Sequence, residues 1–215
     1  RALGEAVLAF VPTSQGLELV TTSTAADLFF RSWRPGPEGL ADGRLSAPEP
    51  ASEELGAIVG VGTGYSAGPA AFVLTYAGRD RAALWRIYPR PRRLGELASP
   101  GTFFARVQDR LVLLEDGRAR VFAAEADTPT EVRFEADDPQ PLAALDETLY
   151  FSAVDAAGRE LWALEGGAAR RVADLAPGPA SSLPSKGAAI DGRLVFNAID
   201  PAHGRETWVS DGTAE

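Results

Sequence analysis

The stretch LDETLYFSAVDAAGRELWALEGG, residues 145–167, returns at residues 190–213 as IDGRLVFNAIDPAHGRETWVSDGT, with one residue inserted before the second Gly-Arg-Glu. A third copy begins GEAVLAFVPTSQGLELV. It occupies residues 4–39 and aligns without a gap on residues 146–181. Self-similarity at a fixed spacing is the signature of a fold assembled from repeated units, so the chain is read here as a repeat protein.

Two weaker copies lie between these, at residues 71–90 and 107–125. The positions recur about every forty residues, except across the Pro-, Glu- and Gly-rich residues 35–56. We therefore predict an inserted loop at 35–56, because such a composition is typical of loops. The five copies place an apolar side chain at one equivalent position: Val20, Trp85, Phe122, Trp162 and Trp208. The predicted repeats are approximately residues 1–34, 57–100, 101–139, 140–184 and 185–215.

Each unit has the pattern of short strands. From Leu149 to Ala153, side chains that would point to one face alternate with Tyr150 and Ser152, which would point to the other. Turn residues follow at Gly158, at Gly166–Gly167 and in APGPASS, and no segment has helical spacing. Four antiparallel strands in roughly 40–45 residues match one blade of a β-propeller.

A lone four-stranded sheet leaves two faces in water, whereas sheets packed face to face in a ring cover both. We therefore predict an all-β fold, a β-propeller of about five four-stranded blades, with the third-strand aromatic filling the gap between neighbouring blades. The rivals are a solenoid and a β-sandwich. A sandwich needs no internal repeat, and solenoid coils are usually shorter than forty residues.

The bulk composition limits the partners. There are 30 acidic and 21 basic residues, for a net charge of −9. Such a surface repels phosphate backbones and anionic lipids, which argues against nucleic acid as a partner. No apolar run is long enough for membrane insertion. Because the chain has no cysteine, disulfides, thiolate chemistry and Cys-based zinc sites are excluded.

The chain begins with Arg1, contains no methionine and starts on what aligns with the second strand of a unit. It ends after what aligns with the third strand of the last unit. We therefore expect a five-blade fragment of a larger propeller of six to eight blades. A closed five-bladed ring is the alternative.

GRELWALEGG and GRETWVSDGT, together with VADLAPGPASS, resemble the ELWxxDGT-repeat family of bacterial multi-repeat β-propeller proteins. The likeness is specific only over residues 145–215. The N-terminal copy keeps the Pro-Gly-Pro of the connector but not the motif. The resemblance implies a propeller and an extracytoplasmic location (secreted, periplasmic or at the cell surface). Further blades of the same parent chain are expected partners because the first and last units are incomplete. It implies no agreed activity.

One basic cluster, RIYPRPRRLG, supplies candidate binding residues: Tyr88, Arg90, Arg92 and Arg93. Aromatic and Arg side chains together can bind anionic sugars. On a chain of this net charge, the alternative is that the arginines offset acidic neighbours.

Three turn aspartates, Asp155, Asp200 and Asp211, are candidate Ca²⁺ ligands, although the D-x-D-x-D-G loop is missing. We favour the alternative that each aspartate caps backbone donors of its turn, with Gly212 at positive φ in the DGT sequence. No cofactor is therefore predicted, with Ca²⁺ as the alternative.

No catalytic residue is predicted. The single histidine, His203, lies in a predicted surface turn, and no Gly-x-Ser-x-Gly elbow is present. The carboxylate pairs Glu53–Glu54 and Asp137–Asp138 have the composition of solvated loops, and GVGTGYSAG from Gly60 lacks the Lys of a phosphate loop.

We therefore expect a non-catalytic, exported module that binds a protein or glycan, or acts as a cell-surface scaffold, with residues 35–56 as the contact surface. The alternative is a glycan-active hydrolase or lyase with carboxylates around a propeller channel. A third expectation is assembly through unpaired sheet edges.

Overall fold

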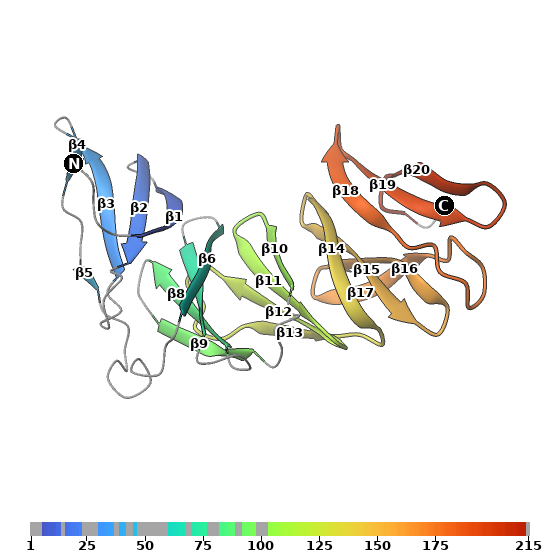
Figure 1. Cartoon of the computed structure of the whole chain (residues 1–215), viewed down its shortest axis with the longest axis horizontal. Coiled ribbons are helices and arrows are strands. Elements are labelled where there is room, and N and C mark those ends of the chain that lie inside the picture. The colour runs from blue at the N-terminus through green and yellow to red at the C-terminus, as the bar shows by residue number, and fades with distance from the viewer. Residues whose placement is uncertain are drawn as a thin grey trace. The chain divides into compact units, whose positions relative to one another are not determined.

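The computed structural model describes residues 6–13, 16–22, 30–36, 39–41, 45–46, 60–67, 70–76, 82–88, 92–97 and 103–213, with side chains in 70–74, 82–86, 92–97 and 104–213. Over these residues the fold is all-β, with no helix, and comprises five antiparallel sheets, each built from strands that follow one another in the sequence (Figure 1). The all-β prediction is confirmed. The arrangement of the sheets in a ring stays a prediction.

The chain divides into two compact units. Unit 1 contains the first two sheets. One has the order β1-β2-β3-β4 with β5 on β3: β1 (Ala6–Thr13), β2 (Gly16–Thr22), β3 (Phe30–Gly36), β4 (Gly39–Ala41) and β5 (Leu45–Ser46). The other has the order β6-β7-β8-β9: β6 (Gly60–Ala67), β7 (Ala70–Tyr76), β8 (Ala82–Tyr88) and β9 (Arg92–Leu97).

The third sheet contributes residues to both units and has the order β10-β11-β12-β13: β10 (Phe103–Val107), β11 (Arg110–Glu115), β12 (Arg118–Ala123) and β13 (Thr130–Arg133). The last two sheets belong to unit 2. They have the orders β14-β15-β16-β17 and β18-β19-β20: β14 (Asp137–Leu145), β15 (Thr148–Asp155), β16 (Gly158–Glu165), β17 (Ala168–Ala173), β18 (Ser185–Ile190), β19 (Arg193–Asp200) and β20 (Gly204–Ser210).

The interval 35–56, for which we expected a loop, contains two short strands, β4 and β5, both paired with β3. Gly36 lies opposite Gly39 where β3 and β4 meet. A Pro- and Gly-rich sequence is as typical of a tight hairpin as of a longer loop, which is why composition did not reveal these strands. Residues 47–56 lie outside the described residues.

The β15–β16 and β19–β20 hairpins share one register. Phe151 lies opposite Trp162 in the first, and Phe196 lies opposite Trp208 in the second. The residue inserted into the second copy lengthens only the turn that follows Asp200. The aligned residues of the two copies therefore occupy equivalent places in their sheets.

β14 starts earlier than the alternation of apolar residues indicates, at Asp137 rather than near Leu142. The sequence predicted a solvated loop at Asp137–Asp138, but these residues begin β14, the edge strand of its sheet, where Pro139 and Pro141 are tolerated. Its pairing with β15 has irregularities between Asp137 and Gln140 and between Pro141 and Ala143. β18, which contains no proline, has an irregularity at the corresponding place, between Ser185 and Ala188, so the interruption recurs with the repeat.

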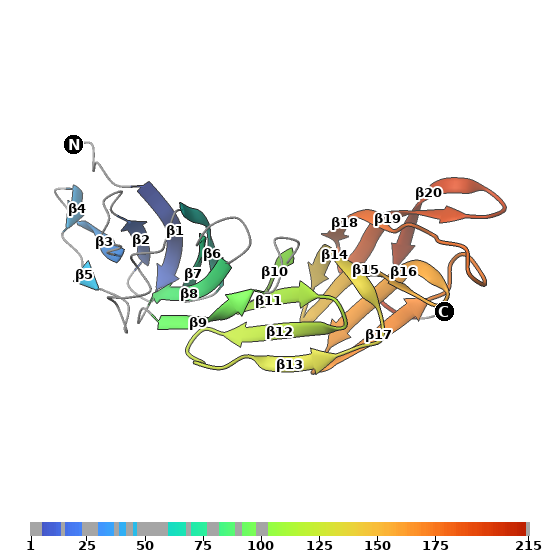
Figure 2. The same cartoon turned by 60° about the horizontal axis from the view of Figure 1, so that its bottom comes forward.

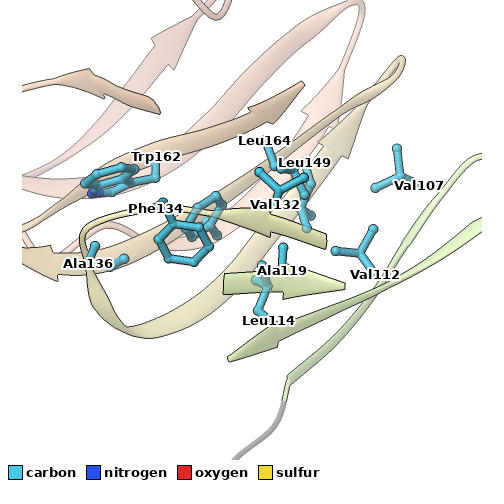
Figure 3. Packing of buried hydrophobic residues seen from close by; sticks show 12 residues of the cluster. Val107, Val112, Leu114, Ala119, Val132, Phe134, Ala136, Leu149, Trp162 and Leu164 are labelled. Atoms are coloured by element: carbon cyan, nitrogen blue, oxygen red, sulfur yellow. The ribbon is translucent and has the colours of Figure 1, made fainter. Parts of the chain in front are cut away.

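The β14–β17 sheet is buried on both faces, as the alternating pattern predicted. Phe151 and Trp162 point to the third sheet, where Phe134 lies with its ring centroid 5.5 Å from Phe151 and 6.0 Å from Trp162 (Figure 3). Removing such a ring from water stabilises by about 2–3 kcal/mol. The opposite face packs against the β18–β20 sheet through Tyr150, Leu161, Ala163, Val172, Leu194, Phe196 and Ala198.

The sheets of unit 2 meet strand by strand. The first strands β10, β14 and β18 contact one another in sequence, and the fourth strand β13 contacts the fourth strand β17 (Figure 2). Trp162 and Trp208 each pack toward the preceding sheet, as predicted for the third-strand aromatic. Three successive repeats therefore pack in one repeating manner.

Candidate functional site

The most unusual side chain among the described residues is Glu160, near the start of β16. Its exposed fraction is 0%, although glutamate is almost never fully buried unless it is paired. Ser182 donates its backbone N–H to Oε1 (2.9 Å) and its hydroxyl to Oε2 (2.6 Å). Leu175 donates its N–H to Oε2 (3.1 Å). The carboxylate thus holds two points of the segment that leads from β17 to β18.

This segment, residues 174–184, is called the connector. Gly158 and Arg159 hold it beside Glu160. Arg159 donates its N–H to Ser181 Oγ (2.9 Å), and Leu183 donates its N–H to the Arg159 carbonyl (3.3 Å). We name Gly158, Arg159 and Glu160 the clamp. The clamp ties the hairpin of one sheet to the chain entering the next.

Burial raises the pKa of Glu160. The hydrogen bonds from Ser182 and Leu175 act in the opposite direction, and the nearby Asp174 raises the pKa further. A raised carboxyl pKa in a cleft is a reason to suspect an acid catalyst. Here the group is inaccessible, and both oxygens accept hydrogen bonds from the connector. The geometry assigns Glu160 to holding the chain.

The side chain of Arg159 extends the clamp to the first strand of its own sheet. It donates to the Asp138 carbonyl (2.9 Å) and also bonds the Asp138 carboxylate. Arg205, its equivalent in the last sheet, reaches the Leu183 carbonyl (3.5 Å). Asp138 and Leu183 occupy equivalent positions, and each has a positive φ, of 47° and 48° respectively. Arg159 and Arg205 therefore each bond a carbonyl of a residue in the same left-handed backbone conformation.

The third sheet uses different residues to hold the segment 134–136, which leads from β13 to β14. Gly117, in its hairpin turn, donates its N–H to the Ala136 carbonyl (3.0 Å) and accepts the N–H of Phe134 (3.0 Å). Asp116 accepts the N–H of Asp138 (2.8 Å). In two successive sheets the hairpin between the second and third strands therefore binds the segment that leads to the next sheet. It does so whether or not the Gly-Arg-Glu motif is present.

The three candidate Ca²⁺ ligands lie in three turns, and each caps backbone donors. Asp155 accepts the N–H of Ala157 (2.8 Å), and Asp200 accepts that of Ala202 (2.6 Å). Asp211 accepts both the N–H (3.0 Å) and the hydroxyl (2.7 Å) of Thr213, and Gly212 has a φ of 91°. Over the described residues no three metal-binding side chains gather. Ca²⁺ binding at these turns stays the alternative to the turn-capping interpretation.

His203 lies in the turn between β19 and β20, where the sequence placed it, and its ring is largely exposed. Nδ1 is 2.9 Å from Oδ2 of Asp200. This hydrogen bond raises the pKa of His203 and lowers the pKa of Asp200. The pair stabilises the turn that is one residue longer than its counterpart.

The basic cluster is ion-paired where it is described. Arg86 is buried and donates to Oδ1 of Asp127 (2.6 Å), while Arg92 donates to Oδ2 (2.6 Å). Arg93 donates to Glu96 (2.9 Å). Arg92 and Arg93, two of the candidate arginines, are thus paired with acidic neighbours. This agrees with the alternative interpretation, in which the arginines offset acidic residues. Arg90 and the side chain of Tyr88 lie outside the described residues.

The paired carboxylates are not brought together as a catalytic pair. Asp137 and Asp138 begin β14, and Asp138 bonds Arg159. Glu53–Glu54 lies outside the described residues. GVGTGYSA, expected not to bind phosphate, forms β6. Sequence reasoning missed Glu160. The available signal was that Gly-Arg-Glu, which occurs twice in the chain, is followed in the same unit by the polar Ser-Ser of the connector.

Replacing the clamp glycine tests how closely the connector packs. A Cβ on Gly158 (φ 91°) would lie 2.5 Å from the Ala180 carbonyl oxygen, whereas one on the equivalent Gly204 (φ 84°) meets nothing within 4 Å. Both Ala variants bear the left-handed backbone cost of about 1–2 kcal/mol. We expect Gly158→Ala to lose about 1–3 kcal/mol more in urea unfolding, because the connector must move. Equal losses would contradict the clamp.

The clamp also makes stability depend on pH. Because the pKa of Glu160 is raised in the folded protein, the folded state binds more protons than the unfolded chain above the ordinary value of 4.5. The free energy of unfolding therefore falls as pH rises through this window. Glu160→Gln removes that dependence and leaves the Leu175 N–H facing a donor, at a cost of about 1–3 kcal/mol.

Urea unfolding of wild type and Glu160→Gln, measured from pH about 4.5 to about 7, checks this prediction. The wild type should lose part of its advantage over the variant as pH rises. Glu147→Gln, at an exposed position in the β14–β15 turn, is the control. A wild-type advantage that stays constant across the range would rule out the titration of Glu160.

Comparison with other proteins adds no assignment. No family model matches the chain, and no curated protein matches it. The ELWxxDGT resemblance therefore stays a prediction. No helix suited to crossing a membrane is found in the described part of the chain.

Proposed function

We propose that this protein is a non-catalytic, exported β-propeller module that binds a protein or glycan, or serves as a cell-surface scaffold. One observation carries the proposal: the β14–β17 sheet is buried on both faces by neighbouring sheets of the same kind. In such a stack each unit serves as packing surface for the next, which is the architecture of repeat scaffolds.

One further feature supports a ring, and a second supports a scaffold. In unit 2 the first strands contact one another more extensively than the fourth strands do. Sheets that radiate from a common axis approach most closely at their inner strands. The charged groups described above also hold connectors and turns, with Glu160 bonded to Ser182 and Arg159 to Asp138. These are the roles that a scaffold needs.

The alternative of a glycan-active hydrolase or lyase has no observation in its favour among the described residues. It needs carboxylates from several sheets around one cavity, at least one of them with a raised pKa. Glu160 has a raised pKa, but its oxygens face the connector. The candidate contact surface at residues 35–56 and the candidate Arg92 stay part of the binding proposal.

Ring closure is measurable because the chain has no native cysteine. In a five-blade fragment of a ring of six to eight blades, the first and last sheets are not neighbours. We therefore expect Thr21→Cys/Thr207→Cys, carrying two spin labels, to give a distance by pulsed electron resonance at least as long as that of a reference pair. The pair Ala123→Cys/Thr207→Cys, on sheets separated by one other, is the reference. A first-to-last distance clearly shorter than the reference would show a closed five-bladed ring instead.

Catalysis is measurable on the same protein. We expect saturable binding to a member of a panel of neutral and uronic-acid-containing oligosaccharides, or to none of them if the partner is a protein, and in either case no product by mass spectrometry after long incubation. Release of new reducing ends or unsaturated sugars, at more than one turnover per chain, would contradict the non-catalytic proposal.

A further inference from the structure

The turn that follows β20 lies directly against the preceding sheet. Gly212, in this turn, has a φ of 91°, and a Cβ on it would overlap the hydroxyl oxygen of Tyr150 and lie 3.1 Å from the Tyr150 Cζ. Tyr150 is 4% exposed and belongs to the core between the two sheets. Because the buried ring cannot swing away without disturbing that core, only glycine fits at position 212.

Hydrogen bonds hold both backbone groups of Gly212 in this place. Arg170, on β17 of the preceding sheet, donates from Nη2 to the Gly212 carbonyl oxygen (3.1 Å). Ser210 Oγ accepts the Gly212 N–H (3.0 Å). We name residues 210–213, with the sequence Ser-Asp-Gly-Thr, the docking turn. The docking turn is thus fixed by its own residues and by two side chains of the sheet before it.

The preceding junction provides a comparison within the same chain. Gly166 occupies the position of Gly212 in its own sheet, yet a Cβ on it would meet nothing within 4 Å among the described residues. The sequence of that turn is Leu-Glu-Gly-Gly. In the third sheet, the position of Tyr150 is occupied by Val112, which packs toward the β14–β17 sheet. The close contact therefore occurs where a tyrosine and a Ser-Asp-Gly-Thr turn occur together.

From these contacts we infer that Tyr150 and Arg170 select the repeat that follows theirs, by recognising its Ser-Asp-Gly-Thr turn. The tyrosine admits only glycine, because any side chain would meet its hydroxyl group. The arginine bonds the carbonyl oxygen of that glycine. Specific interfaces combine such a clash with wrong partners and an attraction to the right one.

The partner recognised is the next repeat of this chain, so the two residues determine which repeat packs beside which. A sheet with valine at the tyrosine position, such as the third sheet, makes no such demand on the turn that follows. This inference deepens the proposed function and rests on its scaffold role, in which each sheet is the packing surface for the next. It depends neither on ring closure nor on the lack of catalysis.

A double-mutant cycle in the 215-residue protein tests the role of the tyrosine. Amide hydrogen exchange of residues 193–210, followed by mass spectrometry, reports the opening of the last sheet. We expect Gly212→Ala to accelerate this exchange at least about tenfold more in the wild-type background than in a Tyr150→Phe background, which lacks the overlapping oxygen. The cost of alanine at a φ of 91° is common to both backgrounds, so the difference isolates the contact.

A second cycle tests the arginine. Arg170→Ala should accelerate the exchange about threefold to tenfold in the wild-type background, because a hydrogen bond is lost. It should have almost no effect once Gly212→Ala has displaced the turn. Gly166→Ala, at a left-handed glycine without the contact, is the control. Its effect on exchange should be the same in the wild-type and Tyr150→Phe backgrounds.

Equal acceleration by Gly212→Ala in both backgrounds would overturn the inference for Tyr150, and additive effects of Arg170→Ala and Gly212→Ala would overturn it for Arg170. Circular dichroism establishes that each variant is folded. If Gly212→Ala alone does not fold, the expected result is that adding Tyr150→Phe restores folding, and failure to restore it counts against the inference. Either failure leaves the oligosaccharide and ring-closure measurements unaffected, so loss of selection and loss of the proposed function are distinguishable.

Discussion

The two apolar faces of the β14–β17 sheet are the constraint on which the rest of unit 2 depends. Phe151 and Trp162 lie on one face of the β14–β17 sheet, and Tyr150 and Leu161 lie on the other. Neither face can stay in water, since each large side chain would forfeit about 2–3 kcal/mol. This sheet therefore needs a neighbour on both sides, and the chain between sheets must be held so that the neighbour arrives in the correct register.

The clamp meets this second requirement with a buried charge. Placing a carboxylate in the interior costs several kcal/mol unless it is satisfied, and Glu160 is satisfied by three donors from Leu175 and Ser182. An apolar residue at this position would pack as well but would leave those donors without acceptors. The carboxylate thus fixes which part of the connector lies where, and hence how β18 approaches β14.

The hairpins and their faces were predictable because the signal there is local and repeated. Alternation from Leu149 to Ala153 and the second copy around Phe196 together indicated both strands and both buried faces. The Asp211 turn was predictable from its own three residues. The burial of Glu160 was not, because it depends on a partner 22 residues away in the sequence. The start of β14 was also missed, since Asp137 and Asp138 have the composition of a solvated loop.

The short reach of the clamp has a consequence for how the protein folds. Within unit 2, nearly every stabilising contact described joins a hairpin to its own partner strand or one sheet to the next. Such a chain behaves as a row of elements coupled to nearest neighbours, with cooperativity concentrated in the junctions. Because each sheet pairs strands that follow one another in the sequence, the junctions between sheets, rather than the sheets themselves, set how far an opening at one end spreads.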